Sequence, residues 1–599
     1  MSTKDEIVAT VNAGYSFDGP VLDMGALVVD AEPIADTQIR IPISMLNRHG
    51  LVAGATGTGK TRTLQVMAEQ LSANGVPVFL ADMKGDLSGL VAPGEGSEKL
   101  LARTAAIGQQ WTPSAFPVEF YALGGQGTGI PVRATITAFG PILLSKILGL
   151  NDVQESSLGL VFMFADQNGL PLLDLKDLRS VIQYLVSDEG KAQLAALGGL
   201  SKQTAGVLLR QLLTFEAQGT DAFFGEPEFD TADLLRVTAD GRGIISCLEL
   251  PAVQDRPELF STFLMWLLAE LFQTLPEVGD LDKPKLVFFF DEAHLLFKGA
   301  SKAFMQAIVQ TVRLIRSKGV GIFFVTQTPK DVPSDVLGQL GSRVQHALRA
   351  FTPDDAKALK ATVGTYPKSG YDLSEVLTSM AIGEAVVTVL SDEGVPTPVA
   401  WTRLRAPQAL MTEANPALVQ QAVAASPQYA KYAFAIDRES AYEMLAARVA
   451  QAEAARAAQE QFDAMAKAAS APPVPAQRLS APRAATPRTS TRRTTQKEPD
   501  TLMEQVLGSA AMKGFASSLG KEITRSIFGT GRRRLPGQVK ARREAAAIGA
   551  INAEDMSNAV KNHAHSSVFL RDKPKCRVND PPATGNVLAC SRAGNRVAL

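Results

Sequence analysis

Apolar positions in the first four hundred residues form short runs that are separated by helical patterns. Nearly continuous apolar runs at Leu51–Ala53, Pro77–Ala81, Lys285–Phe290 and Val320–Val325 are typical of strands buried on both faces of a parallel sheet. Between the first two runs, Thr61–Ser72 places its apolar side chains on one helical face. This order predicts an α/β fold with a mostly parallel central sheet.

The pattern between Pro141 and Leu235 is helical. Amphipathic periodicity is clearest in three segments, Gln154–Ala165, Leu175–Val186 and Gln203–Phe215. The spacing predicts a helical insertion within the α/β core.

Strand patterns occur on both sides of this insertion. Before it, Val118–Tyr121 and Val132–Ile136 flank the glycine-rich loop Gly124–Gly129. That loop has no Lys-Thr pair, so we expect no second phosphate site there. After the insertion, Ala381–Leu390 and Thr397–Leu404 predict a closing hairpin.

The composition changes beyond Ala406. An Ala/Glu/Gln-rich helix is followed by a Pro/Ala/Arg/Thr-rich stretch typical of disorder, and Thr501–Phe528 regains an apolar helical stripe suited to docking on protein or on an anionic membrane surface. The predicted organisation is a lead-in (1–47), an α/β core in two parts (48–140 and 241–406), the helical insertion (141–240), a helical extension (407–470), a disordered basic linker (471–500), an amphipathic helix (501–530) and a disordered tail (531–599).

The formal net charge of −1 conceals an asymmetry. Residues 478–543 carry a net charge of +11, which leaves −12 for the rest of the chain. Such a basic segment binds nucleic acid, anionic lipid or an acidic protein, or it is only a solvated linker. The three cysteines lack metal-ligand or disulfide spacing. There is no apolar leader and no apolar run long enough to cross a bilayer, so we expect a cytoplasmic protein.

Candidate chemistry begins with the segment Gly54-Ala-Thr-Gly-Thr-Gly-Lys60-Thr61, which matches G-x-x-x-x-G-K-[ST] between a predicted strand and a predicted helix. In that context the backbone N–H groups cradle nucleotide phosphates, the lysine reaches the β and γ oxygens, and the threonine hydroxyl binds Mg²⁺. The helix N-terminus adds a partial positive charge. The sequence therefore predicts an ATP and Mg²⁺ site that includes Gly54, Ala55, Thr56, Gly57, Thr58, Gly59, Lys60, Thr61 and Arg62.

A second motif follows the apolar run that ends at Phe290. Asp291 is placed to accept hydrogen bonds from the water ligands of Mg²⁺, and Glu292 is placed to polarise the water that attacks the γ-phosphate. An apolar run followed by Asp-Glu is common, but its position downstream of a phosphate loop favours an ATP hydrolase.

Polar residues at other strand ends are weaker candidates. Asp82 and Lys84 lie where open α/β sheets place ligand-binding groups, which favours a role in the site, with a polar turn at the strand end as the alternative. Gln327 ends another buried strand, where it could sense the γ-phosphate. Arg316 suits the charge of a phosphate in a neighbouring copy, or only the negative end of its own helix.

Four long phrases resemble the YjgR-like branch of the HerA/FtsK superfamily of P-loop ATPases. They are Asn47–Thr61, Val78–Leu87, Lys285–Phe297 and Leu314–Gly321. The resemblance extends from about Arg48 to Trp401 and resumes weakly at 501–529. It implies a RecA-like core that assembles as a homohexameric ring and uses ATP to move on double-stranded DNA. HerA-type helicases carry an N-terminal β-barrel, and residues 1–50 are too short for a full one.

The resemblance also implies roles for single residues. Lys60 and Thr61 correspond to the phosphate-loop residues, Asp291 to the acid on the metal side and Glu292 to the catalytic base. Gln327 corresponds to the sensor, and Arg316 to an arginine finger that acts across the subunit boundary. Arg48 and Asp82 fall where HerA-type enzymes carry site residues.

Two alternatives remain open at this stage. The motor could act on a protein substrate, as do secretion and conjugation motors of the same superfamily. The chain could also be a nucleotide-gated binding module with slow turnover. A nuclease or other protein partner is not identified by the sequence.

Overall fold

The structure of the chain is a computed structural model, which describes residues 4–196, 199–279, 281–298 and 302–469. The expected basic linker (471–500), amphipathic helix (501–530) and tail (531–599) lie outside the described residues. No helix in the described part is long and apolar enough to cross a membrane.

The described strands form one twelve-stranded sheet in the order β2-β1-β12-β11-β10-β3-β9-β8-β4-β7-β5-β6. The strands are β1 (Val21–Val29), β2 (Glu32–Pro42), β3 (Gly50–Ala53), β4 (Val78–Asp82), β5 (Val118–Leu123), β6 (Ile130–Val132), β7 (Ile245–Glu249), β8 (Leu286–Phe290), β9 (Val320–Thr326), β10 (Ser342–Gln345), β11 (Glu384–Thr388) and β12 (Ala400–Leu404).

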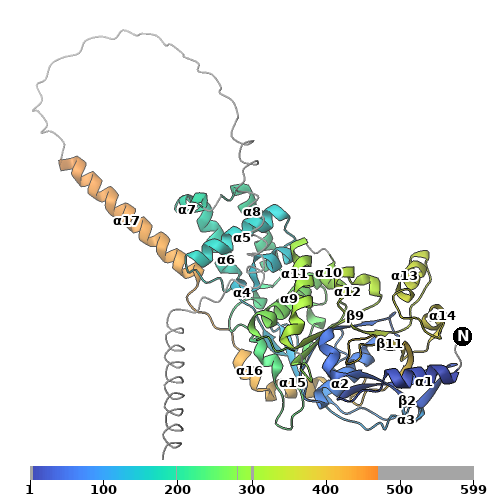
Figure 1. Cartoon of the computed structure of the whole chain (residues 1–599). Coiled ribbons are helices and arrows are strands. Elements are labelled where there is room, and N and C mark those ends of the chain that lie inside the picture. The colour runs from blue at the N-terminus through green and yellow to red at the C-terminus, as the bar shows by residue number, and fades with distance from the viewer. Residues whose placement is uncertain (1–3, 197–198, 280, 299–301, 470–599) are drawn as a thin grey trace, which may run out of the picture. The chain divides into compact units, whose positions relative to one another are not determined.

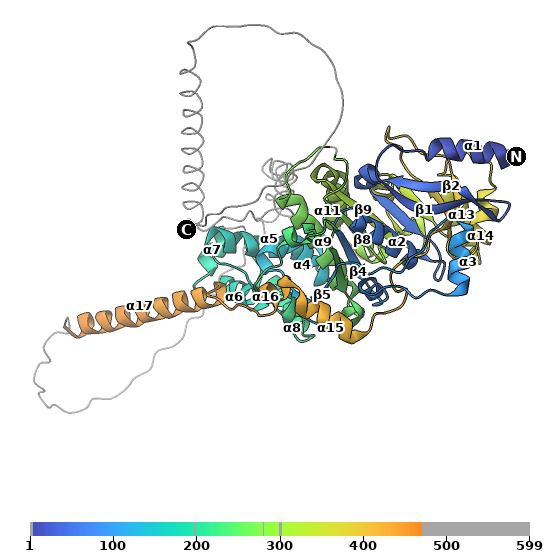
Figure 2. The ribbon, with the colours of Figure 1, turned by 90° about the horizontal axis from the view of Figure 1, so that it is seen from below.

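The predicted α/β fold with a mostly parallel sheet is confirmed. Strands β10 to β6 in the sheet order pair in parallel, and the apolar runs named above are its central strands β3, β4, β8 and β9. The expected closing hairpin is present as β11 and β12, which pair antiparallel. In the lead-in, β1 pairs antiparallel with β12 and β2 pairs antiparallel with β1, so residues 21–42 extend the sheet beyond the hairpin (Figure 2).

Helices pack around this sheet and in a separate group at one side of it (Figure 1). They are α1 (Lys4–Gly14), α2 (Lys60–Ala73), α3 (Glu98–Ala106), α4 (Ile136–Ile147), α5 (Asp152–Gln167), α6 (Leu175–Val186), α7 (Lys191–Ala196), α8 (Lys202–Glu216), α9 (Pro257–Thr274), α10 (His294–Phe297), α11 (Lys302–Ile315), α12 (Ser334–Leu337), α13 (Pro353–Val363), α14 (Leu373–Ser379), α15 (Pro416–Ala425), α16 (Pro427–Tyr432) and α17 (Ala441–Ala469).

The helical insertion begins earlier than predicted. The expected strand Val132–Ile136 is wrong beyond Val132, because the Thr135 side chain accepts a hydrogen bond from Ala138 N and caps α4. Helices α5 and α6 each begin with a reciprocal capping box, at Asn151 and at Asp174, which satisfies N–H groups at the starts of the two helices. Helices α4, α5, α6 and α8 contact one another, and α4 also contacts α9 and α11 of the core.

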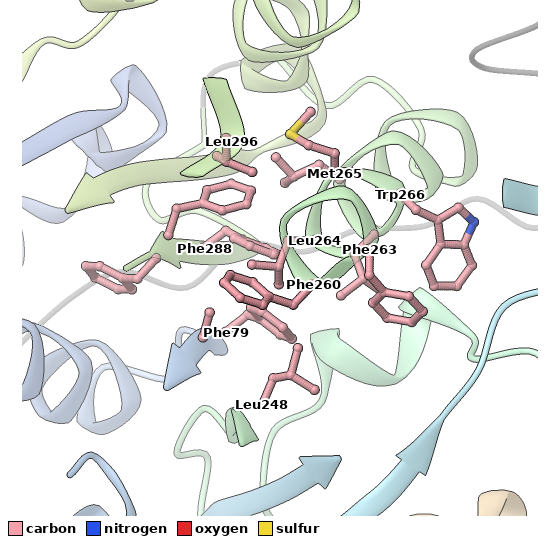
Figure 3. Packing of buried hydrophobic residues seen from close by; sticks show 14 of the residues in the cluster. Phe79, Leu248, Phe260, Phe263, Leu264, Met265, Trp266, Phe288 and Leu296 are labelled. Carbon is pink, nitrogen blue, oxygen red and sulfur yellow. The ribbon is translucent and has the colours of Figure 1, made fainter. Parts of the chain in front are cut away.

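The core is densest where α9 packs against the central strands. Twelve of its eighteen residues are buried, so the helix is apolar almost all round. Its Phe260 and Leu264 lie beside Phe79 of β4 and Phe288 of β8 (Figure 3), and the two strand phenylalanines stack with ring centroids 4.3 Å apart. Each such side chain contributes about 1.5–3 kcal/mol by leaving water. This packing fixes the strands whose ends carry the motifs.

A segment of residues 406–414, here called the strap, crosses beside α2. The buried carboxylate of Glu69 on α2 accepts hydrogen bonds from Gln408 N (2.8 Å) and Ala409 N (3.0 Å). The Gln65 side chain donates to Leu410 O (2.8 Å). Helix α2 follows the glycine-rich loop, so the strap holds the helix on which that loop depends.

Glu69 gives a pH-dependent test of the strap. Burial raises the pKa of Glu69 to about 7, against about 4.5 for an exposed glutamate. Its folded-state pKa is raised, so its contribution to stability is fully present below pH 4.5 and is lost as the pH rises toward 7. The variant Glu69→Gln loses one of the two hydrogen bonds at every pH but has no carboxyl to titrate. We expect its unfolding free energy, relative to wild type, to improve between pH 4.5 and 7 by up to about 3 kcal/mol. Chemical unfolding at several pH values measures this, and a parallel pH dependence in both proteins would contradict it.

Candidate functional site

The glycine-rich loop joins β3 to α2, as the motif requires. Its fold depends on close approach at Gly54, where an added Cβ would lie 2.4 Å from His346 Cβ. Gly57 and Gly59 adopt positive φ angles of 79° and 115°, which glycine adopts without strain. The first N–H groups of α2, which begins at Lys60, have no partners within the helix and are available to an anion.

Lys60 lies across the mouth of this loop. Its ammonium donates to the carbonyls of Gly54 (2.7 Å) and Ala55 (3.2 Å). Burial lowers the pKa of Lys60, and the negative charges of Glu292 and Asp291 oppose that shift. The lysine is therefore close to both acids of the second motif.

Three residues that were not predicted support the loop from outside. His346, at the end of β10, is fully buried, and its Nε2 lies 2.9 Å from Thr63 Oγ1 on α2. Gly383 N donates to Thr58 O (3.0 Å), and the Arg349 guanidinium lies 3.4 Å from Thr56 O. These contacts join segments about three hundred residues apart, so no local pattern indicates them.

The two acids of the second motif follow β8 directly. Asp291 Oδ1 accepts a hydrogen bond from Glu292 N (2.9 Å). Burial, and then the adjacent Glu292 carboxylate, raise the pKa of Asp291 to about 7. Glu292 has a positive φ of 49°, which is a strained conformation for a residue with a side chain. Among the described residues its buried Oε2 has no hydrogen bond, although His294 Nδ1 lies 3.4 Å away.

Gln327 follows β9, which lies between β3 and β8 in the sheet. Its side chain is exposed, while the preceding Thr326 hydroxyl donates to Asp331 Oδ2 (2.8 Å) and fixes the turn. The residue thus lies on the edge that carries the loop and the two acids. Among the residues that the structure describes, its amide makes no hydrogen bond to them.

Asp82 is buried at the end of β4, and its carboxylate is used by its own turn. Oδ1 accepts from Lys84 N (3.1 Å) and Gly85 N (2.8 Å), and Oδ2 accepts from Leu87 N (2.7 Å). These three hydrogen bonds all come from the turn that follows β4, so they support the interpretation of Asp82 as a polar residue that stabilises this turn. The charge of Asp82 also acts on Arg62, whose side chain lies beside this turn.

Cys247 and Glu249 of β7 lie next to Asp82 on the same edge. One ligand atom from each of the three residues lies within 4.8 Å of the others. The Cys247 thiol donates to Glu249 Oε1 (3.6 Å), and burial, then the Asp82 carboxylate, raise the pKa of Glu249 to about 8. The hydrogen bond from the thiol to Glu249 and the backbone bonds to Asp82 explain this group as a strand-end cluster without a metal. The cysteine spacing gave no signal for it because the residues meet only through strand pairing.

The residues at this edge fit ATP and Mg²⁺. The loop offers N–H groups and an ammonium for phosphates, and Gly57 has open space on its Cβ side. The Thr61 hydroxyl at the start of α2 and the Asp291 carboxylate are the oxygen ligands that Mg²⁺ prefers. Groups that suit the phosphates and groups that suit the metal thus lie on the same edge of the sheet.

Arg48 and Arg316 lie elsewhere. Arg48 precedes β3 and Arg316 precedes β9, so both are at the amino ends of strands whose carboxyl ends carry the loop and Gln327. They line a cavity of about 470 Å³ together with Arg313 and Arg343, which we call the arginine pocket. Neither Arg313 nor Arg343 was predicted as a site residue. Arg343 reaches the pocket from β10, which is a separate strand from those that follow Arg48 and Arg316.

The chain matches a family model. The model described as Helicase HerA-like C-terminal matches residues 28–535, which is most of the chain. A protein of Methanocaldococcus jannaschii described as a probable helicase is 24% identical, with 64% of this chain and 70% of that protein covered. The DNA double-strand break repair helicase HerA of Saccharolobus solfataricus is 22% identical, with 62% and 67% covered.

Solved structures also resemble the chain. The bacterial conjugative coupling protein TrwB aligns with a TM-score of 0.44 and 14% identity over 68% of this chain and 94% of that one.

Gly54 gives a test of the loop. In Gly54→Ala the new methyl group would lie 2.4 Å from His346 Cβ and 2.9 Å from Thr58 Oγ1, so the loop must move. We expect ADP-Mg²⁺ affinity to fall at least about tenfold, equivalent to about 1.4 kcal/mol. Isothermal titration calorimetry measures this. The matched control is Gly19→Ala, whose Cβ meets nothing within 4 Å. Equal affinity in both variants would show that this close approach does not shape the binding site.

Proposed function

This chain belongs to the helicase HerA-like C-terminal family of P-loop ATPases, and we propose that it hydrolyses ATP to move double-stranded DNA through a ring of identical subunits, a homohexamer. The observation that carries the proposal is the division of its phosphate-binding groups between two opposite edges of one sheet. Lys60 and the acids are on the carboxyl edge, and the arginine pocket is on the amino edge.

This division favours action between copies. The strand β3 separates Arg48 from the loop, and four strand residues span roughly 13 Å. An arginine at one end cannot contact a phosphate held at the other end of the same strand. A second copy can bring its arginine pocket to the loop, and repeating that head-to-tail contact closes a ring. Arg316 would then stabilise the charge of the phosphate in the neighbour's site.

On the carboxyl edge, each residue has a role that its position supports. The loop N–H groups and Lys60 bind and orient the phosphates. Thr61 and Asp291 would hold Mg²⁺, which supplies positive charge between the phosphate oxygens. Glu292 has a buried carboxylate oxygen, Oε2, that makes no hydrogen bond among the described residues. This oxygen orients the attacking water and accepts its proton. Gln327 lies where it can report the γ-phosphate to β9.

DNA as the substrate rests on two further observations. A curated relative is named as a DNA double-strand break repair helicase. The sequence of this chain carries a net charge of +11 over residues 478–543, which suits the phosphate backbone of DNA. A cytoplasmic location follows from this substrate and is part of the proposal.

Steady-state ATP hydrolysis with and without duplex DNA tests the proposal. We expect DNA to stimulate turnover, and we expect the stimulation to fall as salt rises from about 50 to 200 mM because phosphate contacts release counterions. Lys60→Ala is the blank. Glu292→Gln should bind ATP with unchanged affinity but show at least a hundredfold lower turnover, within the range for a lost proton acceptor. Hydrolysis that is indifferent to DNA would instead favour a protein substrate, and hydrolysis equally slow in wild type and Glu292→Gln would favour a nucleotide-gated module.

Mixed assemblies test the contact between copies. Lys60→Ala lacks the loop lysine and Arg316→Ala lacks the arginine of the pocket, so each alone should be inactive. In an equal mixture, about a quarter of the contacts pair an intact loop with an intact pocket. We expect the mixture to recover ATP hydrolysis that neither variant shows. If the mixture stays as inactive as its components, the two residues act in the same site.

A further inference from the structure

His49 is buried at the point where the arginine pocket meets β3. It follows the 3-10 helix η1 (Ile43–Arg48), adopts a φ of 61°, and is 2% exposed. Its Nε2 lies 2.7 Å from Val312 O on α11, and its Nδ1 accepts a hydrogen bond from Ile322 N on β9 (3.0 Å). One side chain thus joins β3, α11 and β9.

These two contacts define the protonation state of the ring. The Ile322 N–H can only donate, so Nδ1 has no proton. The Val312 carbonyl can only accept, so Nε2 carries one. The ring is therefore neutral, and burial, with the nearby positive charge of Arg316, lowers the pKa of His49 to about 4. The histidine does not act as a proton carrier in the physiological range.

The contact with Val312 fixes the end of α11. This helix ends at Ile315 and continues as the 3-10 turn Arg316–Lys318, so the Val312 carbonyl that His49 contacts lies in the last turn of α11. The His49 Nε2–H supplies a donor there. Arg313 follows Val312 directly, and Arg316 follows it by one helical turn. The bond from His49 to Val312 therefore fixes the backbone from which both arginine side chains extend into the pocket.

The contact with Ile322 has a different task. Pairing between β3 and β9 begins at Gly50 and Phe323, and Ile322 N lies just before that point. The imidazole Nδ1 therefore accepts the hydrogen bond of an N–H that lies just outside the β3–β9 ladder. The two ring nitrogens therefore separate two functions: Nδ1 completes the sheet, and Nε2 holds the helix that carries the arginines.

We propose that His49 is a positioning residue for the arginine pocket, acting through its Nε2–H bond to Val312 to place Arg316 for a phosphate presented by a neighbouring copy. The inference rests on the proposed function, because it needs a phosphate delivered to this pocket. It assigns to His49 no contact with the nucleotide of its own subunit, which lies at the other end of β3.

Two substitutions of His49 separate its hydrogen bond to Ile322 from its hydrogen bond to Val312. In His49→Asn the amide oxygen occupies the place of Nδ1 and keeps the Ile322 bond, but the side chain is too short to reach Val312. In His49→Gln the terminal amide reaches the place of Nε2 and keeps the Val312 bond. Each variant loses one buried hydrogen bond, so we expect both to lower the unfolding midpoint by similar amounts.

The expected kinetic results differ between the two variants. We expect kcat for ATP to fall at least tenfold in His49→Asn and to stay within about threefold of wild type in His49→Gln, with ADP-Mg²⁺ affinity unchanged in both. A purely structural role predicts equal losses of kcat that follow the unfolding midpoints. Equal kcat in the two variants, or a greater loss in His49→Gln, overturns the proposal.

Mixed assemblies show on which side of the contact His49 acts. An equal mixture of His49→Asn and Lys60→Ala should recover hydrolysis, because the first supplies an intact loop and the second an intact arginine pocket. The mixture of Arg316→Ala and Lys60→Ala is the control for the proposed function itself. If the control recovers and the His49→Asn mixture does not, His49 acts through its own loop and this inference is wrong. If the control also fails, the contact between copies is wrong, and the comparison of asparagine with glutamine still decides whether the Val312 bond supports turnover.

Discussion

The parallel pairing of β3, β9, β8, β4 and β7 is the constraint on which the rest of this structure depends. Parallel strands run in one direction, so every carboxyl end lies on the same edge of the sheet and every amino end on the opposite edge. The loop at Gly54, Asp291, Gln327, Asp82 and Glu249 are thereby brought together although up to two hundred and seventy residues separate them. The long apolar runs are what makes this arrangement stable, because both faces of the sheet are covered by helices.

Crowding of acids at one edge has an electrostatic consequence. Desolvation raises the pKa of Asp291 and of Glu249, and neighbouring carboxylates raise both further. The fold relieves part of this repulsion locally: three backbone N–H groups bind Asp82, and a thiol binds Glu249. Asp291 receives a single backbone bond from its own neighbour. A cation beside it would therefore stabilise the Asp291 carboxylate, which is consistent with the role proposed for it.

The sequence predicts the parts of the fold that depend on local patterns. Apolar runs located the central strands, and helical periodicity located α5, α6 and α8 to within about two residues. The sequence did not predict the parts of the fold in which a residue's structure depends on a partner elsewhere in the chain. Thr135 ended a predicted strand because it caps a helix, and β1 and β2 joined the sheet through β12, almost four hundred residues away.

The same division holds for the site. The phosphate loop and the Asp291-Glu292 pair are contiguous motifs, so their spacing alone indicated them. The sequence did not indicate the roles of His49, His346 and Glu69. The residues next to a single buried histidine or glutamate do not reveal which distant segment its side chain supports. Only the three-dimensional partners distinguish these cases.

Two strands link the opposite edges directly. β3 has His49 at its start and the phosphate loop at its end, while β9 begins just after Arg316 and ends just before Gln327. Both are buried, are only four and seven residues long, and are paired to each other along β3. In the proposed ring, β3 and β9 would therefore connect the arginine pocket, which would meet the nucleotide of one copy, to the loop and Gln327 at the chain's own nucleotide site.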